Sequence, residues 1–397
     1  MSPILDLLRS SASARRFFAA YLQSSLGTGM GYVALVLVAL ERFHTSWAVA
    51  LVLIADLVPL MAIGSALGGA ADRLPRRACA VAGDVLRAGA FLGIAFTHDL
   101  GLMLALAALA GVGNGIFNPA ALAGLSHLSG ERHTPAAASL FGALSMLGKT
   151  LGPVVAAGML VAGGVGFALA ANGVSFALSA LLLTTVDLGR APAVADGEAP
   201  APSVSPRAVG GFGRVVVVAS SAALFAGMSN VAEPGFITHD LSASGAAFSL
   251  MVALWGTGVV VGSLAGGGGG DDTRLWRRYL GGLAAIGVGY ASAALAPTFV
   301  LALPGFVLAG LGNGAVIVHE RLLVLSLVPE RGQGRAFGTI EMWASWALAG
   351  AFGLGALAVA GPGARWTLLI AGLGTLAAWG ACAVGAPARR AAVAEQP

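Results

Sequence analysis

The sequence is dominated by long apolar runs that recur along almost all of its length. Runs of about 20 residues begin near Phe17 and continue nearly to the end of the 397 residues. A helix of that length crosses the roughly 30 Å hydrocarbon core of a bilayer and satisfies its own backbone hydrogen bonds. Charged residues make up only 10% of the chain, against about 25% in a soluble domain. The sequence therefore predicts an all-α integral membrane protein.

Charges, Gly/Pro clusters and polar turns divide these runs into twelve predicted membrane helices. The first six are expected at about 17–40, 47–69, 78–96, 101–124, 137–161 and 164–186. The second six are expected at about 215–237, 246–266, 279–297, 300–325, 337–360 and 365–386. An even number of spans places both termini on the same side of the membrane.

The distribution of arginine gives the expected orientation. Seventeen basic residues fall in segments on the side of the N-terminus, whereas only Arg42 and Arg365 fall on the other side. Basic loops stay in the cytoplasm, so both termini are predicted to be cytoplasmic, in a bacterial inner membrane. Three further basic residues, Arg87, Lys149 and Arg321, lie inside predicted helices and need a separate explanation.

The chain also repeats itself. Gly111, Gly113 and Asn114 recur 199 residues later as Gly310, Gly312 and Asn313. Between the copies, residues 187–214 are rich in Pro, Ala and acidic residues, which is typical of a linker. We therefore expect a cytoplasmic segment 1–16, a six-helix bundle 17–186, a cytoplasmic linker 187–214, a second six-helix bundle 215–386 and a cytoplasmic tail 387–397. Parallel repeats of this kind build alternating-access transporters.

A charged turn between the second and third predicted helices has a recognisable pattern. The pattern G-x-x-x-D-R-x-x-R-R is filled by Gly68, Asp72, Arg73, Arg76 and Arg77. In this pattern the chain resembles the major facilitator superfamily of transporters. The resemblance implies a conformational gate, in which the arginines pair with acids such as Asp84. The second copy of the turn, at 262–278, keeps its charges but loses the spacing, so the first copy is expected to control the switch.

A second pattern indicates the direction of transport. Gly148, Gly152 and Pro153, with Lys149 inside the motif, resemble the G-x-x-x-G-P pattern of proton-coupled exporters. The likeness to the drug or siderophore exporter branch implies efflux of a small hydrophobic or amphipathic compound in exchange for protons. The branch often carries an arginine in helix 4, which this chain lacks around Ala107. An importer or uniporter is the alternative within the same fold.

Acidic residues within the predicted helices are candidates for proton coupling, because a charge at the centre of a lipid-facing helix costs at least about 2.5 kcal/mol. These candidates are Asp56, Glu233, Glu320 and Glu341. Asp56 can instead be a buried partner of Lys149 or of a backbone group, and Glu233 a residue of the outer mouth. Lys149 can hold an anionic group of the substrate, extend its ammonium to the membrane surface, or neutralise an acid. Arg321 can pair with Glu341, or it can lie with Glu320 at the wet end of its helix.

In the family that the chain resembles, helices 1, 4, 7 and 10 line the central cavity. This nominates a set of polar substrate contacts, namely Gln23, Tyr32, Asn114, Asn118, Asn230 and His319. Few polar groups among apolar walls suit a hydrophobic or amphipathic compound. Asn114 and its repeat Asn313 can equally hold helices together through hydrogen bonds.

The remaining motifs argue against other classes of function. Cys79 and Cys382 lie far apart without ligand spacing, so neither a disulfide nor a metal site is expected. The GGGGGDD turn lacks the G-K-[ST] of a phosphate-binding loop. We expect no enzyme, no cofactor and no nucleic acid partner. The expected partners are a small-molecule substrate, protons and the lipid bilayer. We expect a monomer, with the proton gradient as the energy source for transport. A receptor-like or lipid-handling membrane protein is the alternative from another class.

Overall fold

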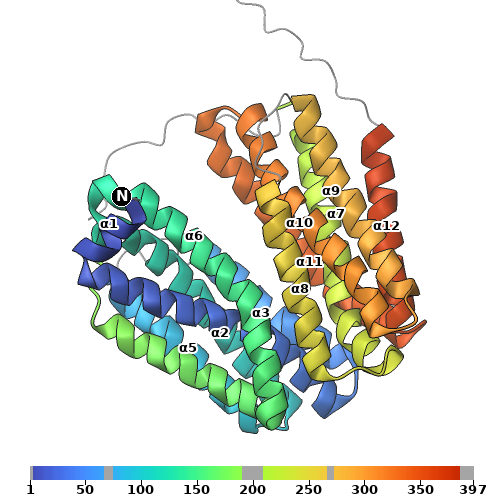
Figure 1. Cartoon of the computed structure of the whole chain (residues 1–397), viewed down its shortest axis with the longest axis horizontal. Coiled ribbons are helices and arrows are strands. Elements are labelled where there is room, and N and C mark those ends of the chain that lie inside the picture. The colour runs from blue at the N-terminus through green and yellow to red at the C-terminus, as the bar shows by residue number, and fades with distance from the viewer. Residues whose placement is uncertain (1–2, 67–74, 190–208, 266–271, 385–397) are drawn as a thin grey trace, which may run out of the picture. The chain divides into compact units, whose positions relative to one another are not determined.

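The structure, a computed structural model, describes residues 3–66, 75–189, 209–265 and 272–384. Within these ranges all regular elements are helices. Figure 1 shows them as long rods joined by short turns. The predicted all-α class is confirmed.

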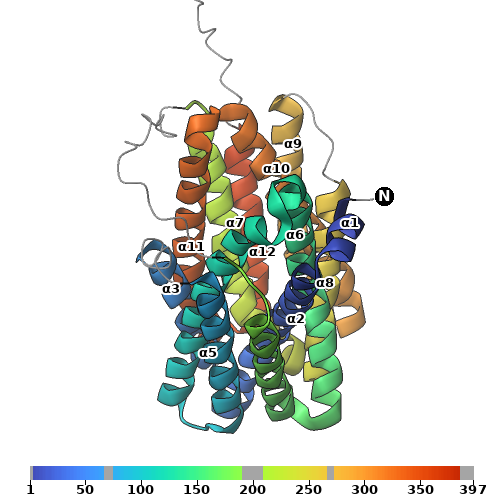
Figure 2. The same cartoon turned by 90° about the vertical axis from the view of Figure 1, so that its left-hand side faces the viewer.

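The N-terminal half contains α1 (Pro3–Ser10), α2 (Ala12–Phe43), α3 (Ser46–Ala66), α5 (Arg76–Phe96) and α6 (Leu100–Thr184). The long α6 is broken at Gly130 and Gly164, whose φ angles of 64° and 75° suit glycine rather than a helix. It therefore consists of three rods, 100–129, 131–163 and 165–184, and Figure 2 shows that α6 folds back on itself. With α2, α3 and α5, this half supplies six helices of membrane-spanning length.

The C-terminal half contains α7 (Phe212–Gly235), α8 (Gly245–Ala265), α9 (Asp272–Leu295), α10 (Phe299–Leu327), α11 (Glu330–Ala360) and α12 (Ala364–Val384). A π-helical turn, Phe236–Asp240, follows α7. The described residues thus hold the two sets of six helices that the sequence predicts. By length and composition alone, nine helical stretches of the described chain qualify as membrane spans.

Helix ends differ from the predictions where charged residues continue a helix beyond its apolar run. α9 begins at Asp272 and α11 at Glu330, each well before the apolar stretch that marked it. The short α1 lies within the N-terminal segment 1–16, and its Leu7 is buried against Phe17 and Phe18. Hydropathy locates the membrane-embedded part of a helix and misses these polar extensions.

The duplication extends to the packing of the helices. A Cβ atom at Gly113 would lie 2.6 Å from the carbonyl oxygen of Gly83, and one at Gly312 would lie 2.5 Å from that of Gly282. Both residues of the second pair follow those of the first by 199 positions. Small residues allow this close approach of backbones in membranes. A residue in α3, α5 or α6 therefore has its structural counterpart 199 positions later.

Polar caps follow the same repeat. Asp99 accepts a hydrogen bond from the backbone N–H of Leu102 at the start of α6, over 2.7 Å. Thr298, 199 positions later, accepts one from Leu301 at the start of α10, over 3.4 Å. Such side chains satisfy backbone donors that have no partner within the helix.

The two arginines expected on the outer side of the membrane serve as helix caps. Arg42 donates to the carbonyl oxygens of Ile94 and Ala95, over 2.7 and 2.8 Å, and to that of Thr97 at the end of α5. Arg365 donates to Ala294 and Ala296 at the end of α9, each over 2.8 Å. Cations stabilise these carbonyl ends, where the helix dipole is negative. Local structure accounts for both exceptions to the arginine distribution.

By their contacts, the described residues form two compact units. One contains residues 3–189, 231–254 and 359–364, and the other contains 209–230, 255–358 and 365–384. Within the first unit, α6 packs on α2, α3 and α5. Within the second, α9 packs on α10. The predicted boundaries of the bundles at 17–186 and 215–386, and of the linker between them, stay a prediction.

Candidate functional site

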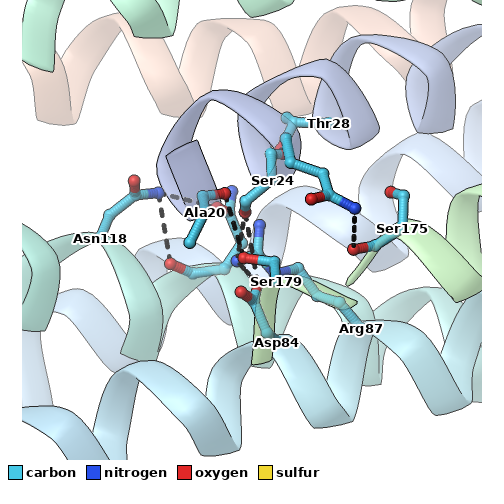
Figure 3. A network of polar contacts seen from close by, with 10 residues as sticks. Ala20, Ser24, Thr28, Asp84, Arg87, Asn118, Ser175 and Ser179 are labelled. Atoms are coloured by element: carbon cyan, nitrogen blue, oxygen red, sulfur yellow. Dashed lines mark hydrogen bonds and ion pairs between the residues drawn. The ribbon is translucent and has the colours of Figure 1, made fainter. Parts of the chain in front are cut away.

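A buried ion pair lies inside the N-terminal helices. Arg87 and Asp84 stand one turn apart on α5, and their side chains form a direct ion pair. Ser24 of α2 accepts from Arg87 over 3.0 Å and donates to Asp84 over 3.3 Å (Figure 3). Asp84 is 0% and Arg87 only 3% exposed. The three side chains form a charged network in the interior of the protein. We call the ion pair of Asp84 and Arg87 the α5 pair.

Aromatic rings enclose the guanidinium group. Its central carbon lies 4.4 Å from the ring centroids of both Phe117 and Phe176. Such cation–π contacts favour arginine, whose guanidinium is planar and weakly hydrated. The network is nevertheless incompletely satisfied, since Asp84 Oδ2 and Arg87 Nε have no hydrogen-bond partner in the described part of the chain. Burying charges in this way is costly.

The second half shows that the fold does not need this pair. The counterparts of Asp84 and Arg87, 199 positions later, are Leu283 and Ile286. Both are buried in α9, with exposures of 0% and 4%. The same helix packing is therefore compatible with apolar side chains at both places. We infer that the charges are kept for something other than packing, as intramembrane charges commonly are.

Asp56 of α3 adds a second carboxyl group to this region. It is half-buried, and its charge interacts with that of Arg87. Asp56 forms no ion pair with Lys149 among the residues described. The alternative that Asp56 is the buried partner of Lys149 is therefore not what the structure shows. Arg87 therefore interacts electrostatically with two acids, Asp84 and Asp56.

A polar cavity adjoins the α5 pair. It has a volume of about 90 Å³ and is lined by residues of α2, α5 and α6. The lining residues are Tyr21, Ser24, Ser25, Thr28, Arg87, Asn114, Phe117, Asn118, Ser145 and Lys149. Two predicted cavity contacts, Asn114 and Asn118, meet here and are joined by a 2.7 Å hydrogen bond between their side chains. The structure thus brings these two to one cavity, together with Arg87 and Lys149.

The predicted exporter motif lies directly against α2. A Cβ atom at Gly29 would lie 2.6 Å from the carbonyl oxygen of Gly148, and one at Gly152 would lie 2.7 Å from the Cα atom of Gly29. Glycine permits this contact between α2 and the second rod of α6. Pro153 follows as a buried residue within the helix. The motif brings Lys149 to the cavity.

Two other predicted cavity contacts of α2 lie away from this pocket. Gln23 donates from Nε2 to the carbonyl oxygen of Ser175 over 3.2 Å, which joins α2 to the third rod of α6. Tyr32 is half-buried in α2 and is not among the residues that line the cavity. Gln23 therefore serves helix packing in this structure.

The predicted gate is only partly within the described residues. Gly68, Asp72 and Arg73 lie outside them, as do residues 266–271 of its second copy. Arg76 and Arg77 begin α5. Asp84 was expected to pair with these arginines across the turn, but it lies two turns into α5, buried against Arg87. The apolar helix around Asp84 prevents it from reaching the surface turn.

A different acid lies near the described gate arginines. Asp187, just beyond α6, interacts electrostatically with Arg77. The backbone N–H of Gly189 donates to its carboxylate over 2.9 Å, and His127 lies 3.4 Å from it. The Gly189 bond, followed by that of His127, lowers the pKa of Asp187 below its ordinary value. The structure therefore identifies Asp187, which sequence reasoning placed in the linker, as an acid near the gate.

The C-terminal candidates are distributed over three helices. Glu233 is buried near the end of α7, 5% exposed, and Asn230 is half-buried one turn before it. On α10, Glu320 is half-buried and interacts with Tyr279 and Glu341, whereas Glu341 of α11 is exposed. No ion pair between Arg321 and Glu341 forms among the described residues. Glu320 thus interacts electrostatically with both Glu341 and Arg321.

His319 precedes Glu320 on α10 and is 1% exposed. Its Nδ1 lies 2.7 Å from the carbonyl oxygen of Ala315, so this nitrogen carries the proton and donates. Its Nε2 is buried without a partner in the described residues. His319 is therefore buried among the helices. It does not line the polar cavity beside the α5 pair, which we call the N-terminal cavity.

Comparisons with known proteins decide the family. The model of the Major Facilitator Superfamily matches residues 17–228, more than half of the chain. The chain belongs to the major facilitator superfamily. It is therefore a multi-pass membrane protein of a transporter family, with the two six-helix repeats of that fold. No curated protein sequence matches this chain.

Solved structures agree with this fold. A bacterial homolog of the human lysosomal transporter Spinster, inward-facing and unoccupied, is 12% identical with a TM-score of 0.71, and the match covers 94% of this chain and 97% of that one. A POT family transporter in complex with 5-aminolevulinic acid is 11% identical with a TM-score of 0.74, covering 94% and 96%. A POT family transporter with a thioalcohol-conjugated peptide is 10% identical with a TM-score of 0.74, covering 94% and 95%. At these identities the likeness shows the fold alone.

Proposed function

We propose that this member of the superfamily exports a small hydrophobic or amphipathic compound, a drug, siderophore or secondary metabolite, in exchange for protons. The α5 pair with Asp56 is the observation that carries the proposal. Asp84 forms an ion pair with Arg87, and Asp56 interacts electrostatically with the same arginine, inside a membrane helix bundle and beside a polar cavity. Such groups are typical of proton pathways in transporters.

Each residue of this site has a separate role. The carboxyl groups of Asp56 and Asp84 take up and release the exchanged proton. The guanidinium group of Arg87 interacts with whichever of them is ionised. Because Arg87 also lines the cavity, occupation of the cavity changes the surroundings of both acids. The polar groups of the cavity hold the substrate, and movement of the two halves exposes it to either side by alternating access.

The direction of transport rests on the exporter motif. Gly148 and Gly152 hold the second rod of α6 against α2 at van der Waals distance. This contact supports the view that the motif is a structural unit rather than a chance spacing. The acids of the second half, Glu233, Glu320 and Glu341, remain candidates for additional proton sites.

Everted membrane vesicles test the proposal. The vesicles are acidified inside by respiration, and the internal pH is followed with acridine orange while carboxyfluorescein, ethidium and other amphipathic dyes are added in turn. We expect at least one dye to release protons from vesicles with the wild-type protein. Asp56→Asn and Asp84→Asn should abolish this release, because an amide cannot carry the proton.

Two controls accompany this test. Glu41→Gln removes an exposed acid at the end of α2 and should leave the exchange intact. Neutral variants of Glu233, Glu320 and Glu341 show whether the second half contributes. The proposal is wrong if Asp56→Asn and Asp84→Asn both still exchange protons for the dye. In whole cells, an uncoupler should raise the dye content of an exporter, whereas a lower content would indicate an importer.

A further inference from the structure

We propose that the N-terminal cavity binds an ionised acidic group of the transported compound, such as a carboxylate, through the ammonium group of Lys149. This proposal rests on the proposed transport function and names the class of its substrate. The rest of the compound is apolar and lies outside this cavity.

Lys149 is exceptional in this chain. It is the only lysine among 22 basic residues, since the other 21 are arginines. It lies within a membrane span on the second rod of α6. Its side chain is exposed and forms no ion pair within the described part of the protein. A charge in such a place faces a wet cavity or a ligand, because lipid does not solvate it.

The other groups around the cavity are those that recognise an anion. Uncharged polar side chains come from Ser25, Ser145, Thr28 and Asn118, the last two of which already donate to oxygens of Ser24 and Asn114. No carboxylate is among the described lining residues. Asp84 is not among the lining residues and forms an ion pair with Arg87. A compact ammonium surrounded by neutral donors gives an anion strong, charge-assisted hydrogen bonds.

The size of the cavity fits a group and not a whole compound. Its volume of about 90 Å³ accommodates a few water molecules or one small polar group, since a single water needs about 10–15 Å³ on the same measure. A carboxylate with part of its hydration shell fills such a space. The apolar part of an amphipathic substrate therefore lies outside it.

The second half again provides the internal comparison. Lys149 corresponds to Leu348, and Ser145 corresponds to Ala344. The match is supported by packing, because a Cβ atom at Gly29 of α2 would lie 3.1 Å from Gly152 and one at Gly227 of α7 would lie 2.6 Å from Ala351, which follows Gly152 by 199 positions. Helix packing at this place thus does not require lysine. Lys149 and Ser145 therefore both have apolar counterparts in the second half.

The single lysine makes the site accessible to chemistry. Full-length protein in lipid nanodiscs is treated with an amine-reactive ester, and the labelled peptides are quantified by mass spectrometry. The N-terminal amine of the same chain serves as the internal reference. Three probes of equal chain length are compared: decanoate, decanol and decyltrimethylammonium. A bound carboxylate pairs with the ammonium of Lys149 and shields it from the reagent.

We expect decanoate to protect Lys149 at a concentration about tenfold lower than decanol, a ratio equal to about 1.4 kcal/mol, and decyltrimethylammonium not to protect it. Ser145→Ala and Asn118→Ala should weaken the protection by decanoate. Arg277→Lys adds a reference amine on the exposed surface of α9, and decanoate should leave its labelling unchanged.

Equal protection by all three probes, or equal protection of the amine added by Arg277→Lys, would overturn the proposal, because either result reports lipid partitioning rather than a site. Labelling of Lys149 that decanoate does not slow would do the same. The assay requires no transport. Protection without any proton exchange would contradict the proposed function and leave the anion site standing, whereas exchange without protection would do the reverse.

Discussion

At the scale of single residues, the main finding is a fully buried pair of charges. Asp84 and Arg87 are spaced so that a helix brings them together, and Ser24 from another helix completes the contact. A buried ion pair seldom stabilises a protein more than apolar residues of similar size would, but removing one partner is costly. Leu283 and Ile286 show what those apolar residues would be.

This comparison predicts the outcome of substituting the pair. Asp84→Leu alone and Arg87→Ile alone should each lower the free energy of unfolding by about 3–5 kcal/mol, because each leaves an unpaired buried charge. The double variant should recover most of this loss, since it reproduces the second half. Unfolding of the purified protein by heat and by denaturant measures these differences.

Transport by the same double variant separates stability from function. We expect it to fold and yet to have lost proton exchange, because Asp84 no longer carries a proton and Asp56 no longer interacts with Arg87. A double variant that exchanges protons as fast as the wild type would show that the pair has only a structural role.

At the scale of helices, glycine sets how closely α2 and the second rod of α6 approach. A Cβ atom at Gly152 would lie 2.7 Å from the Cα atom of Gly29, which is closer than real Cβ contacts allow. Both partners are backbone, so no flexible side chain can move aside. This contact holds the wall that carries Lys149 next to the wall that carries Ser24 and Ser25.

Gly152→Ala should therefore force the two helices apart, lower the stability by about 1–3 kcal/mol and reduce transport. Gly158, further along the same helix, has nothing within 4 Å of its added Cβ. Gly158→Ala should leave stability unchanged or raise it slightly, by up to about 1 kcal/mol, because alanine favours helix more than glycine does. Thermal unfolding in detergent compares the two variants, and equal effects would contradict the role of the contact.

At the scale of the whole molecule, two halves with the same helix packing carry different chemistry. The contacts of Gly113 and Gly312 repeat the packing, whereas the α5 pair and Lys149 occur in the first half only. The same close contacts between small residues therefore position the helices in each half. The proposed function predicts that the residues that depart from the repeat are those that serve transport.

The orientation of the molecule is also a testable expectation. Seventeen basic residues on one side against two on the other predict cytoplasmic termini. The two exceptions, Arg42 and Arg365, are occupied as helix caps. A fluorescent protein fused to the C-terminus should therefore fluoresce in a bacterial host, and alkaline phosphatase at the same place should be inactive. Active phosphatase would reverse the predicted topology.

The sequence by itself determined the number, order and approximate bounds of the helices and their duplication. Hydrophobic length fixes these, because only a helix of about 20 apolar residues spans the bilayer. It also identified Lys149 and Asp56 as charges that need an explanation.

Only the tertiary structure decided which charges meet. The sequence favoured surface arginines as partners of Asp84, and the structure pairs it with Arg87. It also placed Asn114, Asn118 and Lys149 on one cavity. Lipid and protein interior are equally apolar, so the hydrophobic pattern of a membrane helix gives its length but not the face it turns to its neighbours. Close contacts between small residues set that face, and with it the composition of the site.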